Sequence, residues 1–167
     1  EIEIEALEDL FHSTNGEQWD WLYPLSEYGK KWDFNSIPVD PCDNWQGISC
    51  LITDNNNTGT VSTVILNSYN LDGTLTPTLQ NLRNVTTLDF FSNRLYGTIP
   101  STFNNMTWLN TLKLSYNSIS GSIPEMFFTI ASNLSYLSLT ENRIAQPLAD
   151  ISKGQHSTNL KELFLNG

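Results

Sequence analysis

The segment Leu109-Asn-Thr-Leu112-Lys-Leu114-Ser-Tyr-Asn117-Ser-Ile119-Ser-Gly121-Ser-Ile123-Pro124 establishes the architecture of this 167-residue chain, because its pattern recurs along the sequence. Stretches with the same spacing begin at Val61 and Val85, each 24 residues before the next, and related ones begin at Leu134 and Leu160. A fixed period of this length is typical of solenoids, in which each repeat forms one coil and stacked coils share a core.

Each repeat places apolar residues at alternate positions, and in the second to fourth repeats an asparagine follows them. Alternate side chains of a strand point to the same side, so Leu112 and Leu114 are expected to face the core while their neighbours face solvent. Asn93, Asn117 and Asn142 follow successive strands. We expect their amides to hydrogen-bond backbone groups of neighbouring coils that would otherwise be buried without partners.

Over all copies the pattern is L-x-x-L-x-L-x-x-N-x-L-x-G-x-I-P, which resembles the leucine-rich repeat in its plant-type form. The resemblance covers roughly residues 58–167 and implies an α/β repeat solenoid, a right-handed superhelix with a concave parallel β-sheet. It has four repeats and a truncated fifth, and we expect repeats to continue beyond Gly167. Tyr69 replaces the first asparagine and Gln146 the fourth glycine, so the fourth turn is expected to leave the plant-type path.

Residues 1–57 form a different kind of sequence. The spacing of the apolar residues predicts an amphipathic helix over residues 3–13, which Asn15 and Gly16 would end in the left-handed conformation. The stretch from Asp40 to Cys50 resembles the amino-terminal cap of plant-type leucine-rich repeats. This resemblance implies a helical, disulfide-closed cap over residues 1–57.

The two cysteines, Cys42 and Cys50, lie eight positions apart in a chain that has no others, and most simply form one disulfide. A disulfide would place the protein outside the cytosol, in an extracellular or cell-surface location. The alternative is a reduced or metal-bound pair, which would need two further ligands, and the chain offers only the distant His12 and His156.

The charge composition excludes several classes of partner. With 18 acidic and 8 basic side chains, the chain has a formal net charge of −10. This balance argues against nucleic-acid binding and against docking on an anionic membrane surface, both of which need a basic face. No stretch approaches the ~18 consecutive apolar residues of a membrane span.

Catalysis has little support in the sequence. There is no Ser-His-Asp set in a motif context, no metal-binding His-Glu-x-x-His and no phosphate-cradling glycine loop. His12 and His156 are interpreted as surface residues, and the acidic run from Glu1 to Asp9 as the solvated face of a helix. We therefore expect a protein that is not an enzyme and binds no cofactor or metal.

Four Asn-x-Ser/Thr sequons begin at Asn56, Asn84, Asn105 and Asn133. This is about the number that chance gives in a chain so rich in asparagine, serine and threonine. Their placement is more informative, because Asn84 and Asn133 each directly precede the first apolar residue of a strand, where exposure is expected. In a secreted eukaryotic protein, we expect at least two of them to carry N-linked glycans.

The outward positions of the strands predict a concave binding face. Its expected members are Ile65, Asp89, Phe91, Lys113, Tyr116, Tyr136, Glu141 and Phe164. Exposed aromatic residues could anchor a partner, although scattered surface aromatics are also common. Trp108 shares the pre-strand position of Asn84 and Asn133, which suggests a lateral contact, for example with another chain.

These features predict a non-catalytic extracellular recognition module that binds a protein, peptide or glycan. The resemblance implies relatives among the ectodomains of receptor-like kinases, although a fold does not determine a function. One alternative is a glycosylated structural subunit of an extracellular fibre, cell wall or surface coat that associates with itself. Another is a secreted inhibitor of a cell-wall-degrading enzyme.

Overall fold

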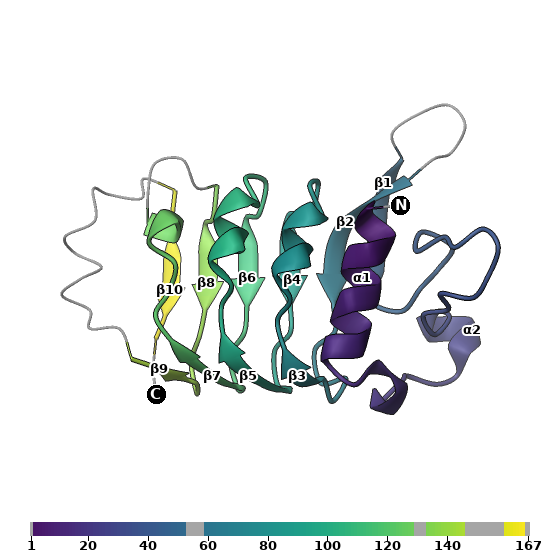
Figure 1. The fold of residues 1–167 in the computed structure, drawn as a ribbon, viewed down its shortest axis with the longest axis horizontal. Coiled ribbons are helices and arrows are strands. Elements are labelled where there is room, and N and C mark those ends of the chain that lie inside the picture. The colour runs from purple at the N-terminus through teal and green to yellow at the C-terminus, as the bar shows by residue number, and fades with distance from the viewer. Residues whose placement is uncertain (1, 53–58, 129–132, 146–158, 166–167) are drawn as a thin grey trace.

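The computed structural model describes residues 2–52, 59–128, 133–145 and 159–165, and they form a leucine-rich-repeat solenoid (Figure 1). The larger sheet has six strands in the order β1-β2-β4-β6-β8-β10. Its strands are β1 (Ile48–Ile52), β2 (Gly59–Ile65), β4 (Thr87–Asp89), β6 (Thr111–Lys113), β8 (Tyr136–Ser138) and β10 (Glu162–Phe164). From β2 onward all neighbours are parallel, as the repeat pattern predicts.

Strand register follows the repeat period. Thr63 pairs with Thr87, which pairs with Thr111, and the inward column of Val64, Leu88 and Leu112 lies beside it. This inward column is completely buried. The predicted alternation of inward and outward positions is therefore confirmed across the coils.

A second, four-stranded parallel sheet follows the turns after the larger sheet, in the order β3-β5-β7-β9. Its strands are β3 (Asp72–Thr74), β5 (Arg94–Thr98), β7 (Ser118–Gly121) and β9 (Arg143–Ile144). In Figure 1 it runs along the lower edge of the solenoid. The first three coils then return through short 3₁₀ turns: η2 (Pro77–Asn81), η3 (Ser101–Asn105) and η4 (Glu125–Phe128). The fourth turn, which was expected to leave the plant-type path, lies outside the described residues. The core lies between these turns and the two sheets.

The recurring asparagines join neighbouring coils. Asn117 donates through Nδ2 to the carbonyl of Phe90 in the preceding coil at 2.9 Å and to that of Leu114 in its own coil at 2.9 Å. Its Oδ1 accepts the backbone N–H of Leu95 at 2.8 Å. Asn93 and Asn142 make equivalent bonds. The expected ladder of side-chain amides is confirmed.

The amino-terminal region (residues 2–52) covers the first coil at one end of both sheets (Figure 1). Helix α1 (Ile2–Ser13) is one residue longer at its start than predicted. Its end meets β3, where Asp72 donates its backbone N–H to the carbonyl of Thr14 at 3.0 Å and Ser13 donates its hydroxyl to the carbonyl of Thr74 at 3.0 Å. The first strand of the second sheet is thereby covered.

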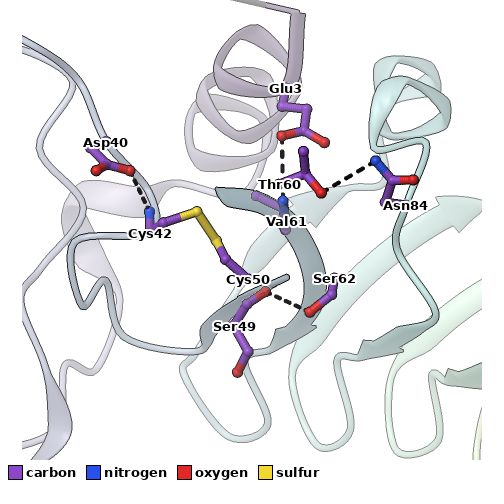
Figure 2. Close-up of a disulfide and its surroundings, with 9 residues drawn as sticks. All are labelled: Glu3, Asp40, Cys42, Ser49, Cys50, Thr60, Val61, Ser62 and Asn84. Carbon is purple, nitrogen blue, oxygen red and sulfur yellow. Dashed lines mark hydrogen bonds between the residues drawn. A yellow bond between two sulfur atoms is a disulfide. The ribbon is translucent and has the colours of Figure 1, made fainter. Parts of the chain in front are cut away.

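Strand β1 pairs antiparallel with β2 and so covers the first of the parallel strands of the larger sheet. The sequence did not predict β1. Cys42 and Cys50 form the expected disulfide, with their Cα atoms 5.7 Å apart. Figure 2 shows this bond beside the β1–β2 pair, where Ser62 donates its hydroxyl to the carbonyl of Ser49. Gly59 packs against the bridge, because an added Cβ would lie 2.8 Å from the Cys42 sulfur.

The turn after α1 differs in detail from the prediction. Asn15 takes the left-handed conformation, with φ 57°, as expected. Gly16 instead begins the 3₁₀ turn η1 (Gly16–Gln18) without a positive φ. Glycine is needed there for packing, since a Cβ would lie 2.2 Å from the Phe11 ring.

A buried glutamine organises the rest of the amino-terminal region, which includes the short helix α2 (Leu25–Tyr28). The Gln46 side chain donates to the carbonyls of Leu22 and Gly29, both at 3.0 Å. It accepts the N–H of Leu22 at 3.0 Å and the hydroxyl of Tyr69 at 3.1 Å. Tyr69, which replaces the first ladder asparagine, thus ties the first coil to this region. The Gln46 carbonyl also accepts the indole N–H of Trp32 at 2.9 Å. Trp32 belongs to one continuous cluster of aromatic side chains: Phe11, Trp19, Trp21, Trp32, Phe34 and Trp45.

Candidate binding surface

The outward positions of β2, β4, β6, β8 and β10 and of the turns that follow them form one surface, termed here the concave face. The strand register places Ile65, Asp89, Lys113 and Phe164 in one column, with Ser138 between the last two. The larger apolar residues predicted for this face are exposed, with 40% of Ile65, 38% of Phe91, 53% of Tyr116 and 42% of Phe164 open to solvent. Glu141 is exposed, and Lys113 and Tyr136 are half-buried.

Asp89 differs from the others, because only 8% of the residue is exposed. Its carboxylate forms an ion pair with Lys113 of the next strand, with Nζ and Oδ2 3.1 Å apart. The other carboxylate oxygen accepts the backbone N–H of Phe91 at 3.1 Å. Asp89 therefore holds the turn after β4 and orients Lys113, and it offers a partner little surface of its own.

Lys113 connects the ion pair to an aromatic group. Its ammonium lies 5.8 Å from the centre of the Tyr136 ring, within the range of a cation–π contact. The Tyr136 ring in turn packs against Phe164, with ring centres 5.5 Å apart. A second pair, Phe91 and Tyr116, meets edge to face at 5.2 Å. The face thus presents two aromatic pairs and one partly exposed cation, fixed by contacts between strands.

A backbone feature of the turns directs one of these rings. Ser68, Ser92, Tyr116 and Glu141 occupy the same repeat position, and all four have left-handed φ values, between 55° and 63°. This conformation is sparsely populated by residues other than glycine, asparagine and aspartate. The sequence places the four in one column, but it carries no glycine there to signal the conformation. The turn sets the direction in which the Tyr116 side chain leaves the backbone.

The flank of the solenoid carries the sequons. Asn84, Asn105 and Asn133 are exposed, whereas Asn56 lies outside the described residues. Each side-chain amide makes one hydrogen bond: Asn84 to the Thr60 hydroxyl at 3.3 Å, Asn105 to Gln80 at 2.6 Å and Asn133 to the Thr107 carbonyl at 2.6 Å. Figure 2 shows the Asn84 bond reaching back to β2. Trp108 occupies the equivalent position in the coil between those of Asn84 and Asn133, and it is 61% exposed.

In the described part of the chain, no three His, Cys, Asp or Glu side chains are grouped so that they could hold a metal ion. No described helix is long and apolar enough to cross a membrane. His12 is exposed on α1 and approaches Glu8 at 3.8 Å, while His156 falls outside the described residues.

A shallow depression of about 520 Å³ lies in the amino-terminal region, away from the concave face. It is lined by residues between positions 30 and 45, among them Trp45 and the ion-paired Lys30 and Asp43. No motif in the sequence pointed to it, because its lining comes from an irregular segment. Its walls combine side chains of both charges with the apolar Ile37, Pro38 and Trp45.

Comparisons with known proteins agree with this fold. Residues 83–144 match the family model described as leucine rich repeat. No curated protein sequence matches the chain. Among solved structures, a chain of the BIR3–SERK2 complex from Arabidopsis thaliana superposes with a TM-score of 0.72 and 26% identity, over 99% of this chain and 81% of that one.

Two further structures share the fold at lower identity. A plant ice-binding protein superposes with a TM-score of 0.70 and 24% identity, over 98% of this chain and 47% of that one. The Arabidopsis receptor kinase HAESA, in complex with the peptide hormone IDA and the co-receptor SERK1, gives a TM-score of 0.60 and 24% identity over 85% of this chain. The chain spans about half of the ice-binding protein and 22% of the HAESA structure's chain.

Proposed function

We propose that this chain is a non-catalytic recognition module that binds a protein or peptide through its concave face. The observation that carries the proposal is the row of aromatic residues over adjacent strands, in which the exposed Phe91, Tyr116 and Phe164 are joined by the half-buried Tyr136. Aromatic side chains bury large areas at little entropic cost and dominate binding hot spots, particularly when they are already held in place.

The ion pair between Asp89 and Lys113 adds specificity to the proposed site. Lys113 is half-buried between Asp89 and the Tyr136 ring, so its direction is restricted before a partner arrives. A carboxylate or backbone carbonyl of a partner could then bind the Lys113 ammonium, and the lysine side chain would lose little conformational freedom on binding. The support from known structures is a similar fold in complexes with proteins and with a peptide.

The proposal includes an extracellular setting. The Cys42–Cys50 disulfide is stable in oxidising compartments, and the exposed amides of Asn84, Asn105 and Asn133 leave room for N-linked glycans. These glycans would cover the flank and leave the concave face open. Residues 1–57 would act as the cap of the repeats in residues 58–167, since the amino-terminal region covers the first strand of both sheets.

A phage-displayed random peptide library is a suitable probe, because it does not require the natural partner to be known. Peptides selected on the wild-type protein should lose at least about tenfold in affinity for Tyr116→Ser, the loss expected for one aromatic anchor. Serine is tolerated at this left-handed position, since Ser68 and Ser92 occupy it in other coils. Biolayer interferometry would give the dissociation constants.

Tyr96→Ser is the matched control. Tyr96 lies on β5 of the second sheet and is 52% exposed, against 53% for Tyr116. The same change on the other surface should leave peptide affinity unaltered. Failure to select any peptide, or equal affinity for wild type and Tyr116→Ser, would contradict recognition through the concave face.

A further inference from the structure

Trp108 is the most exposed tryptophan of the chain. Of the five tryptophans, all within the described residues, Trp19, Trp32 and Trp45 are 4–5% exposed and Trp21 is half-buried, whereas Trp108 is 61% exposed. A solvent-facing indole presents a large apolar area, and such an area commonly marks a contact. The contacts of the concave face do not involve it, because it precedes β6 on the flank.

The neighbouring coils place a sequon asparagine on each side of Trp108, and each side chain reaches back to the coil before its own. The Asn133 side chain reaches back to the coil of Trp108, where its Nδ2 donates to the Thr107 carbonyl at 2.6 Å. Asn110, two residues after Trp108, donates in turn to the Asn133 carbonyl at 3.2 Å. Asn133 therefore lies across the segment that contains Trp108.

Asn84 also reaches back to the coil before its own, but that coil lies on the side away from Trp108. Its Nδ2 donates to the hydroxyl of Thr60, in the coil before its own, which is the direction away from Trp108 (Figure 2). The two sequons thus share a repeat position, and only the Asn133 amide is directed at the tryptophan. Asn84 is therefore a control for Asn133 within the same chain.

We propose that an N-linked glycan on Asn133 folds back over Trp108, so that the first sugar packs a face of its ring on the indole. The inference rests on the proposed N-glycosylation. The sugar is attached to Nδ2, which carries two hydrogens, so the amide keeps one for the Thr107 carbonyl after modification. A pyranose ring has a face of C–H groups that matches an indole face, while its hydroxyls remain in water.

A protein partner fits this position less well. It would have to reach Trp108 between two exposed sequons, Asn84 and Asn133, each one coil away. Glycans are bulky and soluble, and they obstruct macromolecules at such a distance. The glycan of the chain itself needs no approach path, because it is tethered beside the ring.

Acrylamide quenching of tryptophan fluorescence tests the contact, since Trp108 should supply most of the accessible emission. Wild type, Asn133→Gln and Asn84→Gln would be secreted from a eukaryotic cell line, with glycan occupancy measured by mass spectrometry of glycopeptides. The accessible component should be quenched about two-fold more strongly in Asn133→Gln than in wild type, because a sugar covers one of the two faces of the indole. Asn84→Gln should behave as wild type. Trp108→Phe should remove this component and so assign it.

Three outcomes would overturn the proposal, and they are distinguishable. An unmodified Asn133 would refute both the glycan and its contact. An occupied Asn133 with equal quenching in wild type and Asn133→Gln would retain glycosylation and refute the contact. Protection of Trp108 that persists in Asn133→Gln and increases with protein concentration would identify a second copy of the chain as its cover. None of these results depends on peptide binding at the concave face.

Discussion

Replacing Gln46 with methionine should destabilise the protein strongly, although the two side chains have similar volumes. Gln46 is completely buried, and methionine removes all four of its side-chain hydrogen bonds. The carbonyl of Gly29 and the hydroxyl of Tyr69 lose a buried partner, whereas the Leu22 groups are only part-buried. At about 1–3 kcal/mol for each of these two buried orphaned groups, the free energy of unfolding should fall by about 2–6 kcal/mol.

Urea denaturation followed by tryptophan fluorescence would measure this loss, since the buried Trp32 donates its indole N–H to the Gln46 carbonyl. Gln80→Met is the matched control, because Gln80 makes an exposed hydrogen bond with Asn105, and it should cost no more than about 0.5 kcal/mol. Tyr69→Phe in the Gln46→Met background should cost less than in wild type, because the hydroxyl has already lost its acceptor. If Gln46→Met lowers the free energy of unfolding by less than about 1 kcal/mol and shows no coupling to Tyr69→Phe, the four side-chain hydrogen bonds of Gln46 do not organise the amino-terminal region.

Asn117→Ala should lower the free energy of unfolding by about 2–4 kcal/mol, because it leaves the Leu95 N–H and two carbonyls without their partner. Calorimetry would check this against Asn105→Ala, which removes only an exposed hydrogen bond of the side-chain amide. Reducing the Cys42–Cys50 disulfide should cost about 2–3 kcal/mol, the chain-entropy value for an eight-residue separation, measured by urea titration with and without dithiothreitol. Burial raises the pKa of the Glu3 carboxyl in the folded protein, and the hydrogen bond from the Val61 N–H opposes this shift. The folded state therefore holds this proton to higher pH than the unfolded state does. The free energy of unfolding should consequently fall as pH rises above the ordinary glutamate pKa. Glu3→Gln should remove this loss, being more stable than wild type at neutral pH and equal to it below about pH 4, as melting temperatures across pH would show.

Each of these three predictions has a result that would contradict it. Equal stability of Asn117→Ala and Asn105→Ala would mean that the amide ladder adds nothing beyond a surface bond. An unchanged urea midpoint after reduction would show that the short loop is ordered without its bridge. If the melting temperature of Glu3→Gln stays below that of wild type at neutral pH, the negative charge stabilises the start of α1 by more than its burial costs.

The sequence predicted the features that recur with the repeat period. The register of the larger sheet and the hydrogen bonds of Asn93, Asn117 and Asn142 follow from one pattern, because every coil faces the same packing problem. The second sheet was not predicted. Strands such as β7, Ser118–Gly121, are short and mostly polar, and their pairing arises only when the coils are stacked.

The features missed by sequence analysis depend on contacts between distant segments. Gln46 resembles any loop amide, and its partners lie 17 to 24 residues away. Strand β1 was missed because its residues are mostly exposed or half-buried and its partner fixes it. Asp89 occupies an outward position that predicted exposure, and Lys113 of the next coil largely covers it. Local patterns carry no record of such neighbours.

The orientation of the strands determines how the molecule responds to tension. The strands run across the solenoid axis (Figure 1), so the hydrogen bonds between neighbouring coils lie along that axis. A pull along the axis therefore stretches these bonds directly, and the boundaries between coils should separate one at a time. The three boundaries between the first four repeats are each bridged by one ladder asparagine, so these boundaries should resist at a similar level. A stretched molecule should therefore lengthen in steps of about 80 Å, each step releasing one 24-residue coil.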